Sequence, residues 1–381
     1  GELTDITPLE SSGTLGSSPI TTASGSTTIT IADTSHGLEV DQEVLLASAT
    51  AVGGLTAAQL NAYHTVLTTP DANTYSVVVS GAAASSTATG GGTPTYSYLI
   101  PPGFAESTGG TGWGAGTWNQ SGTTFGTART VAATTFNLRN WSFALYGEDL
   151  LMVASDHQTL YKFDTSAGVL SRGAAVTNAP ACEQVLVNAD TRQVLAFGGT
   201  DRMQIAFSEK NDITDWTSTQ TNSAGSVSLG EGSEIIAVSK ARGAGNFLVV
   251  TDQSAYLMTF IGGELVYRFS RVGGTPAPLG PSAIAEADGV VLYMADGAIM
   301  SYSGGTLQQL PCPILRTVFN ELDMTNSRST YAGINAEFGE RMFFYRSSDS
   351  AADNDRVLIW HSAEGPTVWS RSTLDRSAWT D

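Results

Sequence analysis

The order of apolar and polar positions divides the chain into two regions. Between residues 18 and 98, apolar and polar residues alternate over short stretches at 27–31, 40–46 and 74–79, and each stretch is bounded by Gly, Asn, Asp or Pro. Such alternation is typical of strands that bury one face, and the bounding residues are typical of turns. We therefore predict a small β-barrel or β-sandwich over 18–98, preceded by an N-terminal arm over 1–17.

From Trp141 onward the pattern becomes a repeated unit, in which an apolar strand, a turn, a second strand with aromatic residues and another turn follow one another. The first strands begin near residues 149, 193, 246, 289 and 341, at steps of 44, 53, 43 and 52 residues. Their partners are expected at 159–163, 203–207, 255–260, 298–302 and 356–360.

The length of this repeat indicates a particular architecture. Periods of roughly 40 to 50 residues that each hold a β-hairpin are typical of propeller blades, because the apolar faces of a blade are covered only by its neighbours. We predict an all-β protein with a β-propeller over 141–381. Five units are visible, so a sixth blade would need strands from the N-terminal region or from beyond Asp381.

Two short helices and one long loop are expected between these strands. Thr56 is placed to cap a helical turn within 55–63. Residues 312–324 have a helical period, which places Leu315, Val318, Phe319 and Leu322 on one face. Residues 99–140 are rich in Gly and Thr and predict connecting loops, with the two Trp of 109–118 as aromatic anchors.

Composition excludes several classes of protein. The sequence is 41% apolar but contains no apolar run long enough for a membrane-spanning helix, which needs about 20 residues. Residues 1–5 carry neither a basic nor an apolar segment, so no secretory signal is expected. Cys182 and Cys312 are too few for a disulfide scaffold or a cysteine metal cage, and we expect free thiols.

The charge is strongly negative and unevenly distributed. The 36 acidic residues outnumber the 18 Lys and Arg residues, which gives a formal net charge of −18. The first base is Arg129, so residues 1–128 hold nine acids and no base. Tight binding to nucleic acid draws on Lys and Arg that displace counterions from phosphates. We therefore expect no tight binding to nucleic acid.

The four histidines, His36, His64, His157 and His361, match no catalytic or zinc-binding spacing. His36 stands in a predicted turn, and His157 follows an acid in the turn between two predicted strands. We expect structural roles for all four.

The segment 208–216 superficially resembles the Asp-box turn of sialidases, a class of enzyme often built on propellers. No glycine follows its acids, so it departs from that pattern. We predict an acid-rich turn between blade strands, with Trp216 packed inward.

Cation and nucleotide sites have equally weak signals. Asp349, Asp353 and Asp355 lie around a stretch without glycine, so they lack the loop that wraps calcium, and a solvated hairpin loop is expected. The glycine pairs 262–263 and 273–274 match no phosphate-binding motif. We predict no catalytic residue, no cofactor-binding residue and no metal ligand, and a protein that is not an enzyme.

Several strings nevertheless resemble one family, the tail nozzle proteins of short-tailed bacteriophages, also called tail tubular protein B or packaged-DNA stabilisation proteins. The resemblance covers roughly 130–381 and is a pattern over the region without a catalytic signature. The strings are WSF at 141–143, YGEDLL at 146–151, SEKNDITDW at 208–216, GSEII at 232–236, TD at 251–252 with AY at 255–256, YAG at 331–333 with Asn335, and VWS at 368–370. The 18–98 region resembles, at the level of fold, a small β-barrel inserted in ubiquitin-activating enzymes.

The resemblance implies a structural virion protein located in the tail. It implies a homohexameric ring around the DNA exit channel, contacts with an adaptor, fibre or needle protein, and transient passage of double-stranded DNA. Six copies would carry six times −18, or −108 charges, which suits a channel that repels phosphates and lets DNA slide. Two alternatives remain open: a carbohydrate-binding or carbohydrate-degrading tail propeller, and a head-to-tail adaptor or ring protein.

Overall fold

The computed structural model describes residues 5–81, 84–100, 139–168, 171–263, 265–350 and 354–374. The chain is all-β and divides into two compact units. One unit comprises Gly1–Pro102 with Tyr161–Ala175, and the other comprises Gly103–Leu160 with Val176–Asp381. The Gly/Thr-rich loops predicted over 99–140, including both aromatic anchors, lie almost entirely outside the described residues.

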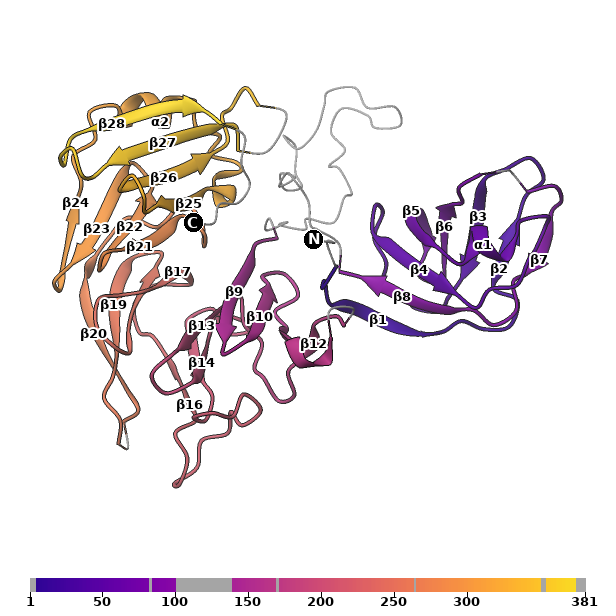
Figure 1. The fold of residues 1–381 in the computed structure, drawn as a ribbon, viewed down its shortest axis with the longest axis horizontal. Coiled ribbons are helices and arrows are strands. Elements are labelled where there is room, and N and C mark those ends of the chain that lie inside the picture. Colours follow the sequence, from indigo (N-terminus) through magenta and orange to yellow (C-terminus); the bar gives the residue numbers. More distant parts are fainter. Residues whose placement is uncertain are drawn as a thin grey trace, which may run out of the picture. The chain divides into compact units, whose positions relative to one another are not determined.

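The N-terminal unit is built around one curled antiparallel sheet of eight strands, in the order β1-β8-β4-β5-β6-β3-β2-β7 (Figure 1). It forms a half-barrel, neither a closed barrel nor a sandwich of two sheets, with β1 and β7 as its edges. The strands are β1 (Leu9–Thr14), β2 (Ile20–Thr22), β3 (Thr28–Ala32), β4 (Glu43–Ala47), β5 (Tyr63–Asp71), β6 (Thr74–Val78), β7 (Ala88–Gly90) and β8 (Thr95–Leu99).

Alternation in the sequence explains how this sheet curls around a core. In β3 the isoleucines at 29 and 31 are fully buried while Thr30 between them is exposed, and β4 buries Val44 and Leu46 in the same way. The inward side chains form a single cluster. The short helix α1 (Ala57–Leu60) is N-capped as predicted, because Thr56 Oγ1 accepts a hydrogen bond from the Gln59 backbone N–H and the Gln59 side chain accepts one from the Thr56 N–H.

The segment predicted as an N-terminal arm contributes a strand to this sheet. β1 pairs with β8 in a register that places Leu9 opposite Leu99. The residues just before β1 are also fixed, because Arg172 forms an ion pair with Asp5 at 2.7 Å and donates a hydrogen bond to the Thr7 carbonyl oxygen. The sheet therefore begins before residue 18.

From Trp141 the described chain forms a five-bladed β-propeller arrangement, in which each blade is a four-stranded antiparallel sheet of consecutive strands. Blade 1 contains β9 (Trp141–Tyr146), β10 (Asp149–Ala154), β11 (Leu160–Phe163) and β12 (Ala174–Ala175). Blade 2 contains β13 (Gln184–Asn188), β14 (Gln193–Phe197), β15 (Gln204–Phe207) and β16 (Gly225–Ser228). Blade 3 contains β17 (Ile235–Lys240), β18 (Asn246–Thr251), β19 (Ser254–Phe260) and β20 (Tyr267–Gly274). Blade 4 contains β21 (Ile284–Ala287), β22 (Val290–Ala295), β23 (Ala298–Ser303) and β24 (Thr306–Gln309), and blade 5 contains β25 (Tyr331–Asn335), β26 (Glu340–Tyr345), β27 (Arg356–His361) and β28 (Trp369–Thr373).

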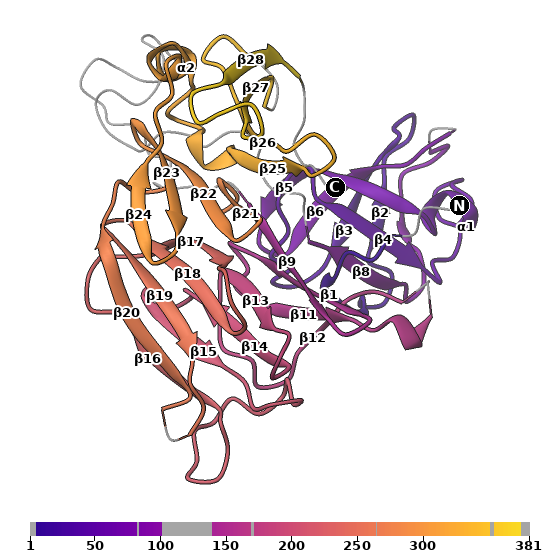
Figure 2. The ribbon, with the colours of Figure 1, turned by 60° about the vertical axis from the view of Figure 1, so that its left-hand side comes forward.

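The first strand of each blade is the inner one. β9 packs against β13, β13 against β17, β17 against β21, and β21 against β25, so these five strands follow one another around the centre (Figure 2). The strand pairs predicted from the sequence correspond to the second and third strands of each blade. The expected all-β propeller is confirmed, and the described residues form five blades.

Neighbouring blades bury their apolar faces against one another, and one cluster fills each of the four interfaces. Between blades 3 and 4, for example, Leu248 and Val250 meet Val291 and Tyr293, all fully buried. Blade faces too apolar to be stable alone thus become a continuous core.

The second helix lies between the last two blades in sequence. It is α2 (Leu315–Glu321). Val318 in the helix and Leu322, its C-cap residue, are buried in the core between blades 4 and 5, with Leu315 and Phe319 packed against them. The predicted helical face is therefore confirmed. Two 3-10 turns, η1 (Thr165–Ala167) and η2 (Ser327–Ser329), complete the described elements. In the part of the chain that the structure describes, no helix has the length and apolar character to span a bilayer.

Candidate functional site

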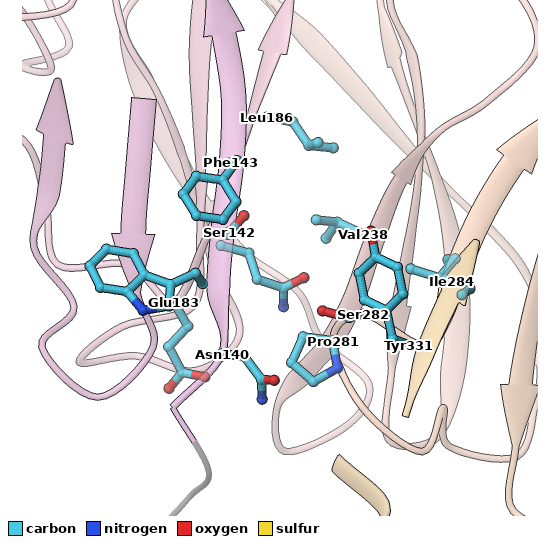
Figure 3. Close-up of a pocket in the computed structure, with 13 residues that line it drawn as sticks. Asn140, Ser142, Phe143, Glu183, Leu186, Val238, Pro281, Ser282, Ile284 and Tyr331 are labelled. Atoms are coloured by element: carbon cyan, nitrogen blue, oxygen red, sulfur yellow. The ribbon is translucent and has the colours of Figure 1, made fainter. Parts of the chain in front are cut away.

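A cavity of about 270 Å³ lies at the centre of the five inner strands, and we call it the axial cavity (Figure 3). Every blade contributes to its lining. The lining residues are Asn140, Trp141, Ser142, Phe143, Glu183, Gln184, Leu186, Val238, Pro281, Ser282, Ile284, Tyr331 and Ala332.

Most of these residues stand at the beginnings of inner strands. Asn140 directly precedes β9, Glu183 precedes β13, Ser282 lies two residues before β21, and Tyr331 is the first residue of β25. Because the inner strands stand side by side around the centre, their first residues gather at one end of the cavity. Figure 3 shows Asn140 and Glu183 at this end and Leu186 at the other.

Aromatic rings form two walls of the axial cavity. Trp141 and Phe143 alternate on one face of β9, and their rings are nearly parallel, with 6.1 Å between centroids and 9° between planes. Tyr331 lies across the cavity from Phe143 (Figure 3). Phe143 is 56% exposed, so this wall of the cavity faces solvent.

Polar side chains of the lining also join the inner strands. Ser142 Oγ accepts a hydrogen bond from the Val185 N–H at 3.0 Å and donates one to the Val185 carbonyl oxygen at 3.3 Å, which ties β9 to β13. Gln184 Nε2 donates to the Ile236 carbonyl oxygen at 3.0 Å and ties β13 to β17. These bonds satisfy buried polar groups and fix the orientation of both side chains.

A four-residue ion cluster stands behind the Glu183 end of the cavity. Arg202 Nη1 lies 2.5 Å from Glu234 Oε2, and Arg202 Nε lies 3.9 Å from Glu183 Oε1. Arg328 Nη1 approaches Glu234 Oε1 at 3.5 Å. Burial raises the pKa of Glu183, and the positive charges of Arg202 and Arg328 oppose that shift. Two carboxylates and two guanidinium groups leave the cluster formally neutral.

The chemistry available in the cavity is limited by this arrangement. Most glycosidases use two carboxyl groups that face one bond, about 5 to 9.5 Å apart, although some families use a tyrosine nucleophile. Among the described residues that line the cavity, Glu183 is the one carboxylate, and Glu234 is held by two arginines. The described lining therefore lacks the carboxylate pair that most glycosidases use.

The histidines weighed in the sequence are all held by local contacts. The rings of His36 and His64 lie 3.0 and 2.9 Å from backbone carbonyl oxygens. His157 and His361 each lie 3.3 Å from a carboxylate oxygen. None of the four lines the axial cavity. The described residues also contain no group of three or more His, Cys, Asp or Glu side chains that could hold a metal ion.

The acid-rich segment 208–216 forms an ordered turn. Glu209 Oε2 accepts a hydrogen bond from the Ser223 hydroxyl at 2.9 Å, and Asp212 accepts one from the Thr214 N–H at 2.8 Å. Trp216 packs against the core between blades 1 and 2, as predicted. The carboxylates thus stabilise the turn and lie outside the axial cavity.

The remaining candidates also have structural partners. Asp355 accepts hydrogen bonds from the N–H and hydroxyl of Ser347, both at 2.8 Å, and Asn354 is buried. The expected solvated loop is therefore anchored at both of its described ends, while Asp353 lies outside the described residues. Gly262 and Gly263, both at positive φ, lie in the β19–β20 connection. Gly273 and Gly274 end β20.

Comparisons with known proteins provide no family for the chain. A scan of protein-family models and a search of curated proteins give no match. Among solved structures, the chain is similar to a phage phi92 endosialidase, with 11% identity, a TM-score of 0.27, and coverage of 98% of this chain and 54% of that one. The chain thus spans about half the length of the endosialidase.

Two further solved structures are similar at comparable levels. A fungal alcohol oxidase of the AA5 family matches with 7% identity and a TM-score of 0.44, covering 98% of this chain and 68% of that one. A dihydro-heme d1 dehydrogenase matches with 10% identity and a TM-score of 0.39, covering 61% and 47%. These values transfer no ligand, activity or site to this chain.

Proposed function

We propose that this chain is a structural subunit of the tail of a short-tailed bacteriophage, which assembles as a homohexameric nozzle around the DNA exit channel and contributes to genome retention and ejection. The proposal starts from the sequence resemblance over 130–381. Blades that share apolar cores with their neighbours form a rigid arrangement, which suits the wall of a channel.

The observation that carries the proposal is the pairing of basic side chains with carboxylates of the same chain. Ten of the 18 Lys and Arg side chains form ion pairs with carboxylates of the same chain in the described residues. They are Arg139, Lys162, Arg172, Arg202, Arg271, Arg328, Arg341, Arg346, Arg356 and Arg371. Phosphate binding needs cations that are free to displace counterions. A chain with net charge −18 whose cations are largely paired suits a surface past which DNA slides without adhering.

The lining of the axial cavity favours a role other than hydrolysis by a pair of carboxylates. Its single carboxylate, Glu183, lies beside the Arg202 guanidinium and lacks a second lining carboxylate among the described residues. Most glycosidases use a carboxylate pair, so the described lining gives less support to the degrading alternative.

The decisive experiment is a reconstruction of the virion that carries this chain. Six-fold density for the chain on the tail axis is the expected result. Density only in peripheral fibres would refute the nozzle, and density between head and tail would assign the chain to an adaptor ring.

Two biochemical measurements complement the reconstruction. The purified protein is expected to bind double-stranded DNA weakly even at low salt, and tight binding with a steep salt dependence would contradict the charge argument. Release of reducing ends from host polysaccharide, lost in Glu183→Gln, would support the carbohydrate-degrading alternative.

A further inference from the structure

The axial cavity has a composition that the nozzle role does not require. We propose that it binds the terminal residue of a neutral glycan. This inference is independent of the proposed function, because it rests on the lining of one cavity within a single chain.

The first argument is the aromatic wall. Phe143 on β9 is 56% exposed at the cavity, and its ring stacks on that of Trp141. Tyr331 faces it from β25 (Figure 3). Pyranose rings present a face of C–H groups, and an aromatic ring carries negative charge on its face, so the two surfaces are complementary. A solvent-facing aromatic pair is therefore suited to stack on a sugar.

The second argument is the set of polar groups beside that wall. Gln184 lines the cavity, and its Nε2 donates a hydrogen bond to the Ile236 carbonyl oxygen, which fixes this side chain. The Glu183 carboxyl and the Ser282 hydroxyl belong to the same lining. An amide, a carboxyl and a hydroxyl group within one small cavity suit the hydroxyl groups of a sugar, which both donate and accept hydrogen bonds.

The third argument is charge, which favours a neutral ligand. The lining contains Glu183 and no Lys or Arg among the described residues. The guanidinium groups of Arg202 and Arg328 pair with Glu234, and Arg202 also lies beside Glu183. With these guanidinium groups already paired, the described lining offers no cation to an anionic sugar, whereas a neutral sugar needs none.

The fourth argument is size. Cavities that enclose a whole drug-sized ligand measure about 300–1,000 Å³. At about 270 Å³ the axial cavity is smaller, so it admits one ring. Because its β9 wall faces solvent, the rest of a glycan chain can remain outside, and the residue bound is a terminal one.

The test is ligand-observed saturation-transfer NMR on the full chain. The probes are the methyl glycosides of glucose, galactose, mannose, rhamnose and N-acetylglucosamine, with the methyl glycoside of N-acetylneuraminic acid as the anionic comparison. We expect saturable transfer from at least one neutral glycoside, with a dissociation constant of about 1 mM, as for a small ligand in one shallow cavity.

Two phenylalanine variants provide a matched pair. Phe143→Ala removes the exposed ring from the cavity and is expected to weaken binding about tenfold, a difference of about 1.4 kcal/mol. Phe338→Ala removes another exposed ring, 65% accessible, from the β25–β26 turn outside the cavity and is expected to leave binding unchanged. Because both rings are mostly in solvent, neither change should unfold the protein.

Three results would overturn the proposal. The first is no transfer from any neutral glycoside to the wild-type chain. The second is equal affinity in Phe143→Ala and the wild type, which would place binding elsewhere. The third is binding of the anionic glycoside alone. None of these results bears on the position of the chain in a virion, so the nozzle proposal is tested separately.

Discussion

The Tyr267 hydroxyl provides a test of how two neighbouring blades are joined. Tyr267 begins β20 of blade 3, and its Oη accepts a hydrogen bond from Asn188 Nδ2 at 3.0 Å and donates one to Gln193 Oε1 at 3.2 Å. Both partners belong to blade 2 and are at most 1% exposed. In Tyr267→Phe the ring keeps its edge contacts with Phe207 and Phe260, so the oxygen is the one group removed.

The expected cost follows from what each partner retains. Gln193 Oε1 still accepts a hydrogen bond from Thr191 Oγ1 at 3.0 Å. Asn188 Nδ2 has no second acceptor among the described residues, and an orphaned buried donor costs about 1–3 kcal/mol. We expect the free energy of unfolding to fall by about 2 kcal/mol. With a urea slope of about 3 kcal/mol per molar for a unit of this size, the midpoint falls by about 0.7 M.

Urea titration with tryptophan fluorescence measures this change. All seven Trp residues lie at or beyond residue 113, so the signal does not come from the N-terminal sheet. Tyr256→Phe is the matched control, because Tyr256 on β19 packs in the same cluster and its hydroxyl has no hydrogen bond in the described part of the chain. The control is expected to stay within about 0.5 kcal/mol of the wild type. Equal midpoints for the two variants would refute the reasoning.

Three further predictions concern acid stability, thiol reactivity and backbone geometry. Burial raises the pKa of Asp156, but hydrogen bonds from its neighbours, including a bidentate pair with Arg139, outweigh it and hold the pKa well below its usual range. The contribution of Asp156 to stability is therefore present above about pH 4 and is lost as the pH falls further. In Asp156→Asn, the stability measured by circular dichroism should depend less on pH in the acid range. An unchanged pH profile would count against this. Burial raises the pKa of the Cys182 thiol to about 12. Mass spectrometry should therefore find this thiol unlabelled by iodoacetamide at pH 8 until urea is added. Rapid labelling of the folded chain would contradict this. A Cβ at Gly199 would lie 2.1 Å from a backbone oxygen, whereas a Cβ at Gly297 meets nothing within 4 Å, and both glycines have positive φ. The melting temperature of Gly199→Ala should therefore lie well below that of Gly297→Ala. Similar melting temperatures for the two variants would argue against the clash.

The sequence predicts the middle strands of each blade because both faces of these strands are buried, so most of their residues are apolar. β14 and β22 are almost continuously apolar and nearly every position is buried, which stands out against the turns around them. The outer strands do not stand out, since β12 has two exposed alanines and β24 is largely polar. The inner strand β9 mixes exposed aromatic residues with polar ones, so its pattern is ambiguous.

Long-range pairing limits the prediction of the N-terminal unit. β1 is mostly exposed and polar, so its pattern does not mark it as a strand. It becomes one because β8 offers it an edge, with Leu9 opposite Leu99. Local alternation contains no information on such a partner.

The axial cavity could not be predicted from motifs. Its residues come from five strands and share no spacing, and Glu183 and Gln184 belong to no recognisable pattern. The blade repeat nevertheless provides a signal, because the inner strand precedes each predicted pair and residues at or just before its start line the cavity in four of the five blades. Once a blade repeat has been recognised, the residues just upstream of each pair are the ones to inspect.

The construction of each blade from consecutive strands has a consequence for how the molecule opens and evolves. No sheet is completed by strands from both ends of the repeat, so the propeller behaves as a linear array with two terminal members. Amide hydrogen exchange should be slowest in blades 2 to 4, which are covered on both sides, and faster in blades 1 and 5. Duplication or loss of one four-strand segment would change the blade number without cutting any sheet, which makes the width of such a ring readily adjustable in evolution.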